Sequence, residues 1–267
     1  MKTLYVNGDS WTEGDELGLP YKENETELYR FYNSWGGQLH KLLGTIMHFN
    51  DGKGGTSNHR IFRRTTKFIK EYSKKADPTQ LVVAICWTTL DRDEIPVDII
   101  PYSMSPSRLQ PGNIPLGFHG MNRPCSNDPI EGIGWYIPIQ MYGVNLPNYS
   151  SINKLNDTTI TALKQMEKPY TVTIGSKSRS EEQYLRMWNL KQICNSLEIK
   201  LVQSWALEDG EFEPGSNDFV EEYMDDIQYL PEIFIKFCRK NNYPLAPGGH
   251  CLEVGHENWA KYIYENI

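Results

Sequence analysis

An alternation of short apolar runs with longer amphipathic segments is the feature that most limits how this chain can fold. The clearest run, LVVAI at residues 81–85, is apolar at every position. Such a run is typical of a central strand in a parallel sheet, which is buried on both faces, and amphipathic segments between runs predict crossover helices. The sequence therefore predicts an α/β fold, with a mostly parallel sheet wrapped by helices in a three-layer α/β/α sandwich.

The periodicity predicts four strands and four helices. The strands are expected over residues 2–6, 46–50, 81–85 and 199–203. The helices are expected over residues 34–43, 58–73, 180–197 and 254–266, where apolar residues recur at helical spacing. Residues 180–183, SEEQ, have the pattern of a capping box and predict the start of the third helix.

Two segments break this regularity. Between residues 95 and 175 proline and glycine are frequent and no period is sustained, and residues 207–247 are irregular and partly acidic. Because connections of this length are unusual inside a compact domain, we interpret both as insertions in a single domain of residues 1–267. The first insertion is expected to pack over the carboxyl edge of the sheet and to contain a helix near residues 153–166.

Composition and charge exclude several classes of protein. Hydrophobic residues make up 39% and charged residues 23% of the chain, which predicts a globular protein. The formal net charge of -7 argues against a nucleic-acid partner. No apolar stretch is long enough for a membrane span, and the start lacks the apolar core of a signal peptide. We therefore expect no membrane partner and a cytoplasmic location, or a place on a virion if the chain is of phage origin.

The cysteines and histidines indicate neither disulfides nor a metal. The five cysteines are scattered, odd in number and never spaced as CxxC, which predicts a reducing compartment without a disulfide framework. No HExxH or HxH pattern is present, so we expect no catalytic metal, and no cofactor is indicated.

The segment GDSW at residues 8–11 raises the first chemical hypothesis. It follows the predicted first strand directly and places Ser10 where ligands bind in open α/β sheets, at the carboxyl end of a strand. One interpretation is a turn that happens to contain serine. The other is a nucleophile at the edge of the sheet.

Three more segments follow predicted strands or precede the last helix. Residues 50–58, NDGKGGTSN, could present backbone N–H groups to an oxyanion, or form a flexible turn or a phosphate cradle, although the GK[ST] ending of a Walker loop is missing. Residues 86–92, CWTTLDR, carry polar side chains past the central strand. His250 in the loop of residues 248–256 could deliver an imidazole base to a serine.

Taken in this order, the four segments resemble the SGNH/GDSL hydrolase family. The resemblance rests on GDS at residues 8–10, GTSN followed by Arg60 and Ile61, a strand that ends in Trp87-Thr88, and a histidine loop followed by GHxxWA. It is nearest to the divergent members met in bacteriophage and polysaccharide-locus proteins, and it implies that the mostly parallel sheet has a flavodoxin-like strand order.

The resemblance implies a nucleophile and an oxyanion hole. Ser10 would attack an acyl carbonyl, Asp9 would shape the turn beneath it, and the amides of Ser10 and Gly55 would be oxyanion donors. The family's third donor is an asparagine in a Gly-x-Asn-Asp block, which this chain lacks. Thr88 or Thr89 is a candidate for this third oxyanion donor, and Asn58 is a further candidate.

The resemblance also implies His250 as general base, with His256 in the position of a structural histidine. The family's orienting aspartate would lie two or three residues before the base, where this chain has Gly248 and Pro247. A Ser–His dyad with a backbone carbonyl, a carboxylate such as Glu253 or one from residues 208–226, and a degenerate site all remain open.

Two neighbours of the predicted central strand complete the candidate site. Trp87 is expected to support it, and Arg92 either binds a polar substrate or pairs across the sheet edge.

Together these expectations describe a serine esterase with a Ser–His acyl-enzyme mechanism. Its substrate would be a small-molecule or glycan ester, with O-acetyl or another small acyl group on a carbohydrate or glycoconjugate. The alternatives are a catalytically degenerate binding or virion-structural protein and an acyltransferase that uses the same serine. The sequence predicts no particular oligomeric state.

Overall fold

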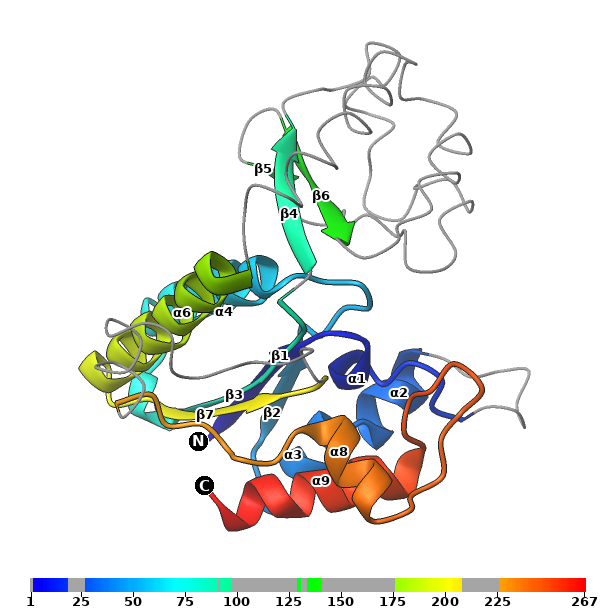
Figure 1. The fold of residues 1–267 in the computed structure, drawn as a ribbon. Coiled ribbons are helices and arrows are strands. Elements are labelled where there is room, and N and C mark those ends of the chain that lie inside the picture. Colours follow the sequence, from blue (N-terminus) through cyan, green and yellow to red (C-terminus); the bar gives the residue numbers. More distant parts are fainter. Residues whose placement is uncertain are drawn as a thin grey trace, which may run out of the picture.

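A central sheet of four parallel strands organises the molecule (Figure 1). The computed structural model describes residues 2–18, 27–90, 92–97, 129–130, 134–140, 176–207 and 226–267. The strands of the sheet, in the order β2-β1-β3-β7, are β2 (Met47–Asn50), β1 (Thr3–Gly8), β3 (Leu81–Trp87) and β7 (Lys200–Trp205). The chain thus starts beside the centre of the sheet and steps to both sides, as in flavodoxin-like folds.

Helices cover both faces of this sheet, which gives the three layers predicted from the sequence. One layer contains α2 (Glu27–Asn33), α3 (Trp35–Leu43), α8 (Phe234–Lys240) and α9 (Glu253–Glu265). The other contains α4 (Asn58–Ser73) and α6 (Ser176–Ser196), and a short 3-10 turn, Pro78–Gln80, leads into β3. The predicted fold class is therefore confirmed.

The core divides into two halves because successive side chains of a strand point to opposite faces. Leu4, Val6 and Ala84 pack with Trp35 and Trp259 of the first layer. The intervening strand residues pack with the second layer: Tyr5, Val83, Ile85, Ile61 and Met187 belong to one cluster. Burial on both faces explains the unbroken apolar run of β3.

Most predicted elements agree with the structure to within about two residues, and α4 has the predicted bounds. The predicted start of α6 is wrong. This helix begins at Ser176 rather than Ser180, so the SEEQ pattern lies inside it. Gln183 is 1% exposed, so its side chain lies in the interior and does not cap a helix start.

The first insertion contains strands that the sequence did not predict. β4 (Arg92–Val97), β6 (Gly134–Gln140) and β5 (Pro129–Ile130) form an antiparallel sheet in the order β4-β6-β5. Pro96 and Pro138 lie within paired segments, and proline inside a run argues against a strand in sequence-based reasoning. The helix expected near residues 153–166 lies outside the described residues. The second insertion, residues 207–247, was expected to be irregular, but its residues 234–240 form the helix α8.

The expectation of no disulfide is wrong for one pair of cysteines. Cys238 in α8 and Cys251 in the histidine loop form a disulfide across a sequence separation of 13. No local spacing motif marks such a pair, because it forms only when the two segments fold together. Cys86 and Cys194 are free and buried, and burial raises the pKa of the Cys194 thiol to about 12.

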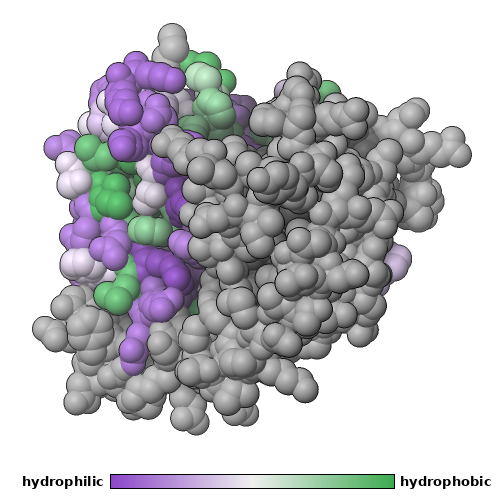
Figure 2. Space-filling model, turned by 90° about the horizontal axis from the view of Figure 1, so that it is seen from above, coloured by the Kyte–Doolittle hydropathy of each residue, from purple (hydrophilic) through white to green (hydrophobic). Residues whose placement is uncertain are grey.

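The described surface seen from above is mostly hydrophilic with small hydrophobic patches between (Figure 2). Within the part of the chain that the structure describes, no helix has the length and apolar character needed to cross a bilayer.

Candidate active site

Ser10 and His250 lie together at the carboxyl end of β1. Ser10 is the first residue of the short helix α1 (Ser10–Glu13), and the Asp9 carboxylate caps this helix by accepting the Trp11 N–H at 3.1 Å. Oγ of Ser10 lies 2.8 Å from Nε2 of His250. The indole of Trp11 packs beside the imidazole, with ring centroids 5.4 Å apart. A hydroxyl and a base therefore share a hydrogen bond although 240 residues separate them.

A carboxylate that the sequence did not indicate completes this arrangement. Oε2 of Glu16 lies 2.7 Å from Nδ1 of His250, and the Glu16 carboxylate also accepts the Gly248 and His250 amide N–H groups at 2.7 and 3.3 Å. An Nδ1–H donated to Glu16 leaves Nε2 as the acceptor for the Ser10 hydroxyl. The three side chains thus form a continuous hydrogen-bonded chain.

The electrostatics of Glu16 favour its ionised form. Burial acts to raise the pKa of its carboxyl, but hydrogen bonds from the His250 ring and the two backbone amides outweigh burial, and this pKa lies below its usual value. The backbone of Glu16 has φ 63, in the left-handed region that costs a non-glycine residue about 1–2 kcal/mol. A strained residue that orients a candidate base is consistent with a functional constraint.

The carboxylates that the sequence suggested for this role lie elsewhere. Glu253 accepts a hydrogen bond from the Tyr29 hydroxyl at 2.7 Å. Asp226 pairs with Lys191 at 2.9 Å, and residues 208–225 lie outside the described residues. The signal for Glu16 was weak: an acidic pair, Asp15-Glu16, directly follows Gly14 at the end of α1. The direction of its side chain depends on a turn that local sequence patterns do not reveal.

His256 is fully buried and lies in the core. Its Nδ1 accepts the Trp35 amide N–H at 3.0 Å, and burial lowers its pKa to about 3. The imidazole is therefore neutral and fixes the start of α3 against α9.

A buried network lies directly beneath Ser10. The Asp9 carboxylate is 0% exposed, and its Oδ2 accepts hydrogen bonds from the Thr88 hydroxyl at 2.8 Å and from Nη1 of Arg92 at 3.2 Å. Arg92 also donates to the Thr88 hydroxyl at 2.9 Å. Two roles were considered for Arg92, substrate binding and an ion pair across the sheet edge. The structure contains the ion pair, with Asp9 as its partner.

Two of the suggested oxyanion donors are engaged in contacts of their own. The Thr88 hydroxyl is bound to Asp9, and the Asn58 amide donates to the Thr88 and Thr89 carbonyls at 2.9 and 3.3 Å and accepts the Thr88 N–H at 2.9 Å. These contacts tie α4 to the end of β3. The side chains of Thr88 and Asn58 therefore hold neighbouring elements together, and Thr89 is half-buried.

Trp87 also lies away from the rim. Its side chain is 0% exposed and its Nε1 donates to Oε1 of Gln203 in β7 at 3.1 Å. It supports the sheet from within the core.

The glycine-rich loop after β2 approaches the nucleophile closely. A Cβ added to Gly54 would lie 3.6 Å from Cβ of Ser10 and 2.9 Å from Oδ2 of Asp15, so a side chain there would crowd the site. The next residue, Gly55, has φ +73, which glycine adopts without strain. The loop therefore brings its backbone beside Ser10.

Metal ligands do not gather in the described part of the chain, where no group of three or more His, Cys, Asp or Glu side chains is arranged to hold an ion.

Comparisons with known proteins give one partial family match and several distant similarities to solved structures. Residues 18–115 match a family of unknown function, DUF6071, and no curated protein matches the chain. One similar structure, described as a lipolytic protein of the G-D-S-L family from Desulfitobacterium hafniense DCB-2, is 12% identical with a TM-score of 0.40, and the match covers 100% of both chains. The acetyl xylan esterase AlAXEase is 12% identical with a TM-score of 0.40, over 99% of both chains.

A third similar structure is a carbohydrate esterase whose active site is described as having divergent catalytic and non-catalytic binding functions. It is 10% identical with a TM-score of 0.39, and the match covers 99% of this chain and 64% of that one.

Proposed function

We propose that this protein is a serine esterase in which Ser10 is the nucleophile, His250 the general base and Glu16 the residue that orients the base. The observation that carries the proposal is the hydrogen-bonded chain from Ser10 Oγ through His250 to the Glu16 carboxylate, with distances of 2.8 and 2.7 Å. A base oriented by a third group, and in contact with a hydroxyl, is the arrangement that activates a serine.

The reaction would proceed in two halves. His250 Nε2 takes the Ser10 proton while Oγ bonds to the carbonyl carbon of the ester, and the resulting oxyanion is stabilised by backbone N–H groups. His250 then returns the proton to the alcohol oxygen as the C–O bond breaks, which leaves an acyl-enzyme. Water attacks this ester with His250 again as base, releasing the acid and restoring Ser10. No cofactor enters either half.

The oxyanion donors in this proposal are the amides of Ser10 and Gly55. Ser10 is the first residue of α1, a position whose N–H has no partner within the helix. Gly55 follows Gly54, where an added Cβ would lie 3.6 Å from Cβ of Ser10. For a third donor we propose Thr89, a half-buried residue just past β3, because its hydroxyl can donate a hydrogen bond.

The substrate we propose is a small-molecule or glycan ester, with a small acyl group such as O-acetyl on a carbohydrate. The resemblance of the motifs to SGNH/GDSL hydrolases and the 12% aromatic content, which suits stacking on sugar rings, favour this class. The rival hypothesis of a degenerate binding protein rested on Gly248, where the orienting acid is missing, and on the missing asparagine block. Glu16 beside His250 weakens the first of these two arguments.

Covalent labelling tests the proposal. A fluorophosphonate probe and p-nitrophenyl acetate are applied to the wild type, to Ser10→Ala and to Ser196→Ala, a matched change at an exposed serine of α6. We expect the wild type and Ser196→Ala to be labelled, with the adduct on Ser10, and Ser10→Ala to be silent. A wild type no more reactive than Ser10→Ala would refute the esterase. Product analysis with a sugar acceptor present separates hydrolysis from acyl transfer.

A further inference from the structure

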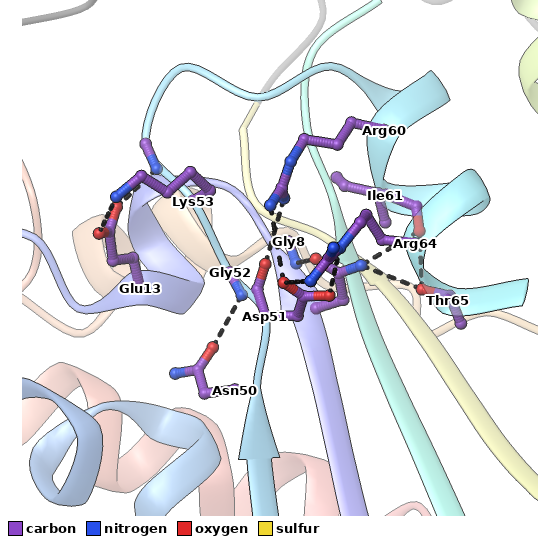
Figure 3. Close-up of polar contacts among 12 residues, drawn as sticks. Gly8, Glu13, Asn50, Asp51, Gly52, Lys53, Arg60, Ile61, Arg64 and Thr65 are labelled. Carbon is purple, nitrogen blue, oxygen red and sulfur yellow. Dashed lines mark hydrogen bonds and ion pairs between the residues drawn. The ribbon is translucent and has the colours of Figure 1, made fainter. Parts of the chain in front are cut away.

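The glycine-rich loop of residues 51–55 is held at both ends by carboxylates, as Figure 3 shows. One carboxylate is its own Asp51 and the other is Glu13 of α1. The candidate oxyanion donor Gly55 lies at the end of this loop. How the loop is held therefore bears on the geometry of the site.

At the first end, Asp51 is anchored to α4 and β1. Arg64 binds the carboxylate in a two-pronged contact, with Nε and Nη2 at 2.8 and 2.9 Å from its two oxygens. The Tyr5 hydroxyl donates to Oδ2 at 3.0 Å, and Arg60 donates to the Asp51 carbonyl at 3.2 Å. These contacts join the loop to the scaffold but do not involve the helix that carries Ser10.

At the second end, Glu13 binds the loop through both of its oxygens. Oε1 accepts a hydrogen bond from Nζ of Lys53 at 2.8 Å, and Oε2 accepts the Gly54 amide N–H at 2.6 Å. Burial acts to raise the pKa of the Glu13 carboxyl, but Lys53 and the Gly54 amide outweigh burial, and this pKa lies below its usual value. The 20% exposed carboxylate is therefore held ionised between two donors.

Glu13 and Ser10 belong to the same single turn of helix. A contact from Glu13 to the loop consequently fixes the distance between the nucleophile and the loop backbone. The neighbouring Lys53 amide donates to the Gly8 carbonyl at 3.0 Å, on the strand that leads into the same turn. Asn50 also links α1 to the loop, since it donates to the Thr12 carbonyl at 2.8 Å and accepts the Gly52 N–H at 2.9 Å. Glu13 is the α1 side chain that binds the turn next to Gly55.

We propose that Glu13 is a positioning residue for the reaction, which holds the Gly54–Gly55 turn at the spacing from Ser10 that an oxyanion requires. The inference rests on the proposed function. Glu13 itself makes no contact with the reacting atoms. Since an oxyanion donor acts in the transition state and not in substrate binding, loss of Glu13 should lower kcat and leave KM nearly unchanged.

The test compares four variants in p-nitrophenyl acetate hydrolysis. Glu13→Ala removes both contacts, and Glu13→Asp withdraws the carboxylate by one methylene group with little risk to folding. Glu13→Gln keeps an oxygen that can accept the Gly54 N–H. Glu257→Ala, which removes an exposed ion pair with Lys261 on α9, is the matched control.

We expect kcat to fall about 10- to 100-fold in the Ala and Asp variants, with KM within about threefold of the wild type. Glu13→Gln should recover most of kcat, and Glu257→Ala should match the wild type. Amide hydrogen exchange supplies a readout independent of activity: the Gly54 amide should be protected in the wild type and exchange faster in Glu13→Ala and Glu13→Asp.

An active wild type with unchanged kcat in folded Glu13→Ala and Glu13→Asp would overturn this inference alone. So would unchanged protection of the Gly54 amide in both variants, or a fall in kcat/KM caused by KM. A wild type without Ser10-dependent activity would instead overturn the proposed function, and the kinetic role of Glu13 with it.

Discussion

The carboxylate of Glu16 occupies the space that a side chain on residue 248 would need. A Cβ added to Gly248 would lie 2.5 Å from Oε2 and 2.6 Å from both Cδ and Oε1 of Glu16. Contacts this short require one of the two groups to move. The absence of a side chain at residue 248 is thus matched by an acidic side chain that arrives from the turn after α1.

This exclusion predicts that the orienting acid can be exchanged between the two positions. Glu16→Gly removes the acid while suiting the left-handed backbone at this residue, and should lower kcat by about 100- to 10,000-fold, by analogy with loss of the aspartate in a serine protease. The double variant Glu16→Gly with Gly248→Asp should recover part of kcat. Gly248→Asp alone should be less active than the wild type because two carboxylates then compete for one space.

The measurement is kcat for p-nitrophenyl acetate together with thermal unfolding for each variant. A double variant no more active than Glu16→Gly, although equally folded, would show that an acid at residue 248 cannot replace Glu16.

The depressed pKa of Glu16 predicts how stability depends on pH. Above the usual carboxyl pKa of 4.5 the group is ionised in both the folded and unfolded chain, so its hydrogen bonds contribute fully to the free energy of unfolding. As pH falls below 4.5 the unfolded chain takes up the proton first, and the contribution is lost as pH falls through the folded-state pKa.

Urea unfolding of the wild type and Glu16→Gln between pH 3 and pH 7 checks this dependence. The stability difference between the two proteins should be largest above pH 4.5 and shrink in more acidic solution. The corresponding change at an exposed carboxylate, Glu257→Gln, serves as the comparison. A difference that grows as the solution is acidified would contradict the assignment.

The ion pair beneath Ser10 predicts that Arg92 stabilises the fold. Arg92→Met leaves the fully buried Asp9 carboxylate without its cationic partner, at a cost of about 3 kcal/mol in the free energy of unfolding. Adding Asp9→Asn should recover part of this loss. Urea unfolding of the wild type and Arg92→Met measures the loss of stability. KM of the two proteins for an ester substrate shows whether Arg92 also contributes to substrate binding. A large rise in KM without loss of stability would favour substrate binding by Arg92.

The disulfide between Cys238 and Cys251 predicts a measurable contribution to stability. Its sequence separation of 13 corresponds to about 3 kcal/mol in the chain-entropy account. The double variant Cys238→Ala with Cys251→Ala should therefore unfold at lower urea concentration. Peptide mapping without reductant should recover the two cysteines on linked peptides, which separate on reduction. Unlinked peptides under non-reducing conditions would argue against the bond.

The sequence by itself determined the architecture because the relevant signals are local. The apolar run of β3 and the helical spacing of residues 58–73 report burial directly, and they led to a parallel sheet covered by helices. Ser10 directly follows the first strand, and His250 lies in the loop before the last helix. Both were therefore predicted as candidates at the carboxyl edge of such a sheet. The second sheet was not predicted because β4 and β6 each contain a proline, and a proline inside a run argues against a strand.

Only the tertiary structure decided which groups meet. Glu16 reaches His250 because its backbone is left-handed in the turn after α1, and a glutamate in the sequence does not predict that conformation. The Thr88 hydroxyl and the Asn58 amide were candidate donors by type, but neighbours from other elements already bind them. Cys238 and Cys251 pair because α8 and the histidine loop pack together. Local periodicity encodes which faces are buried, whereas hydrogen bonds and disulfides between distant segments depend on distances that exist only after the layers have assembled.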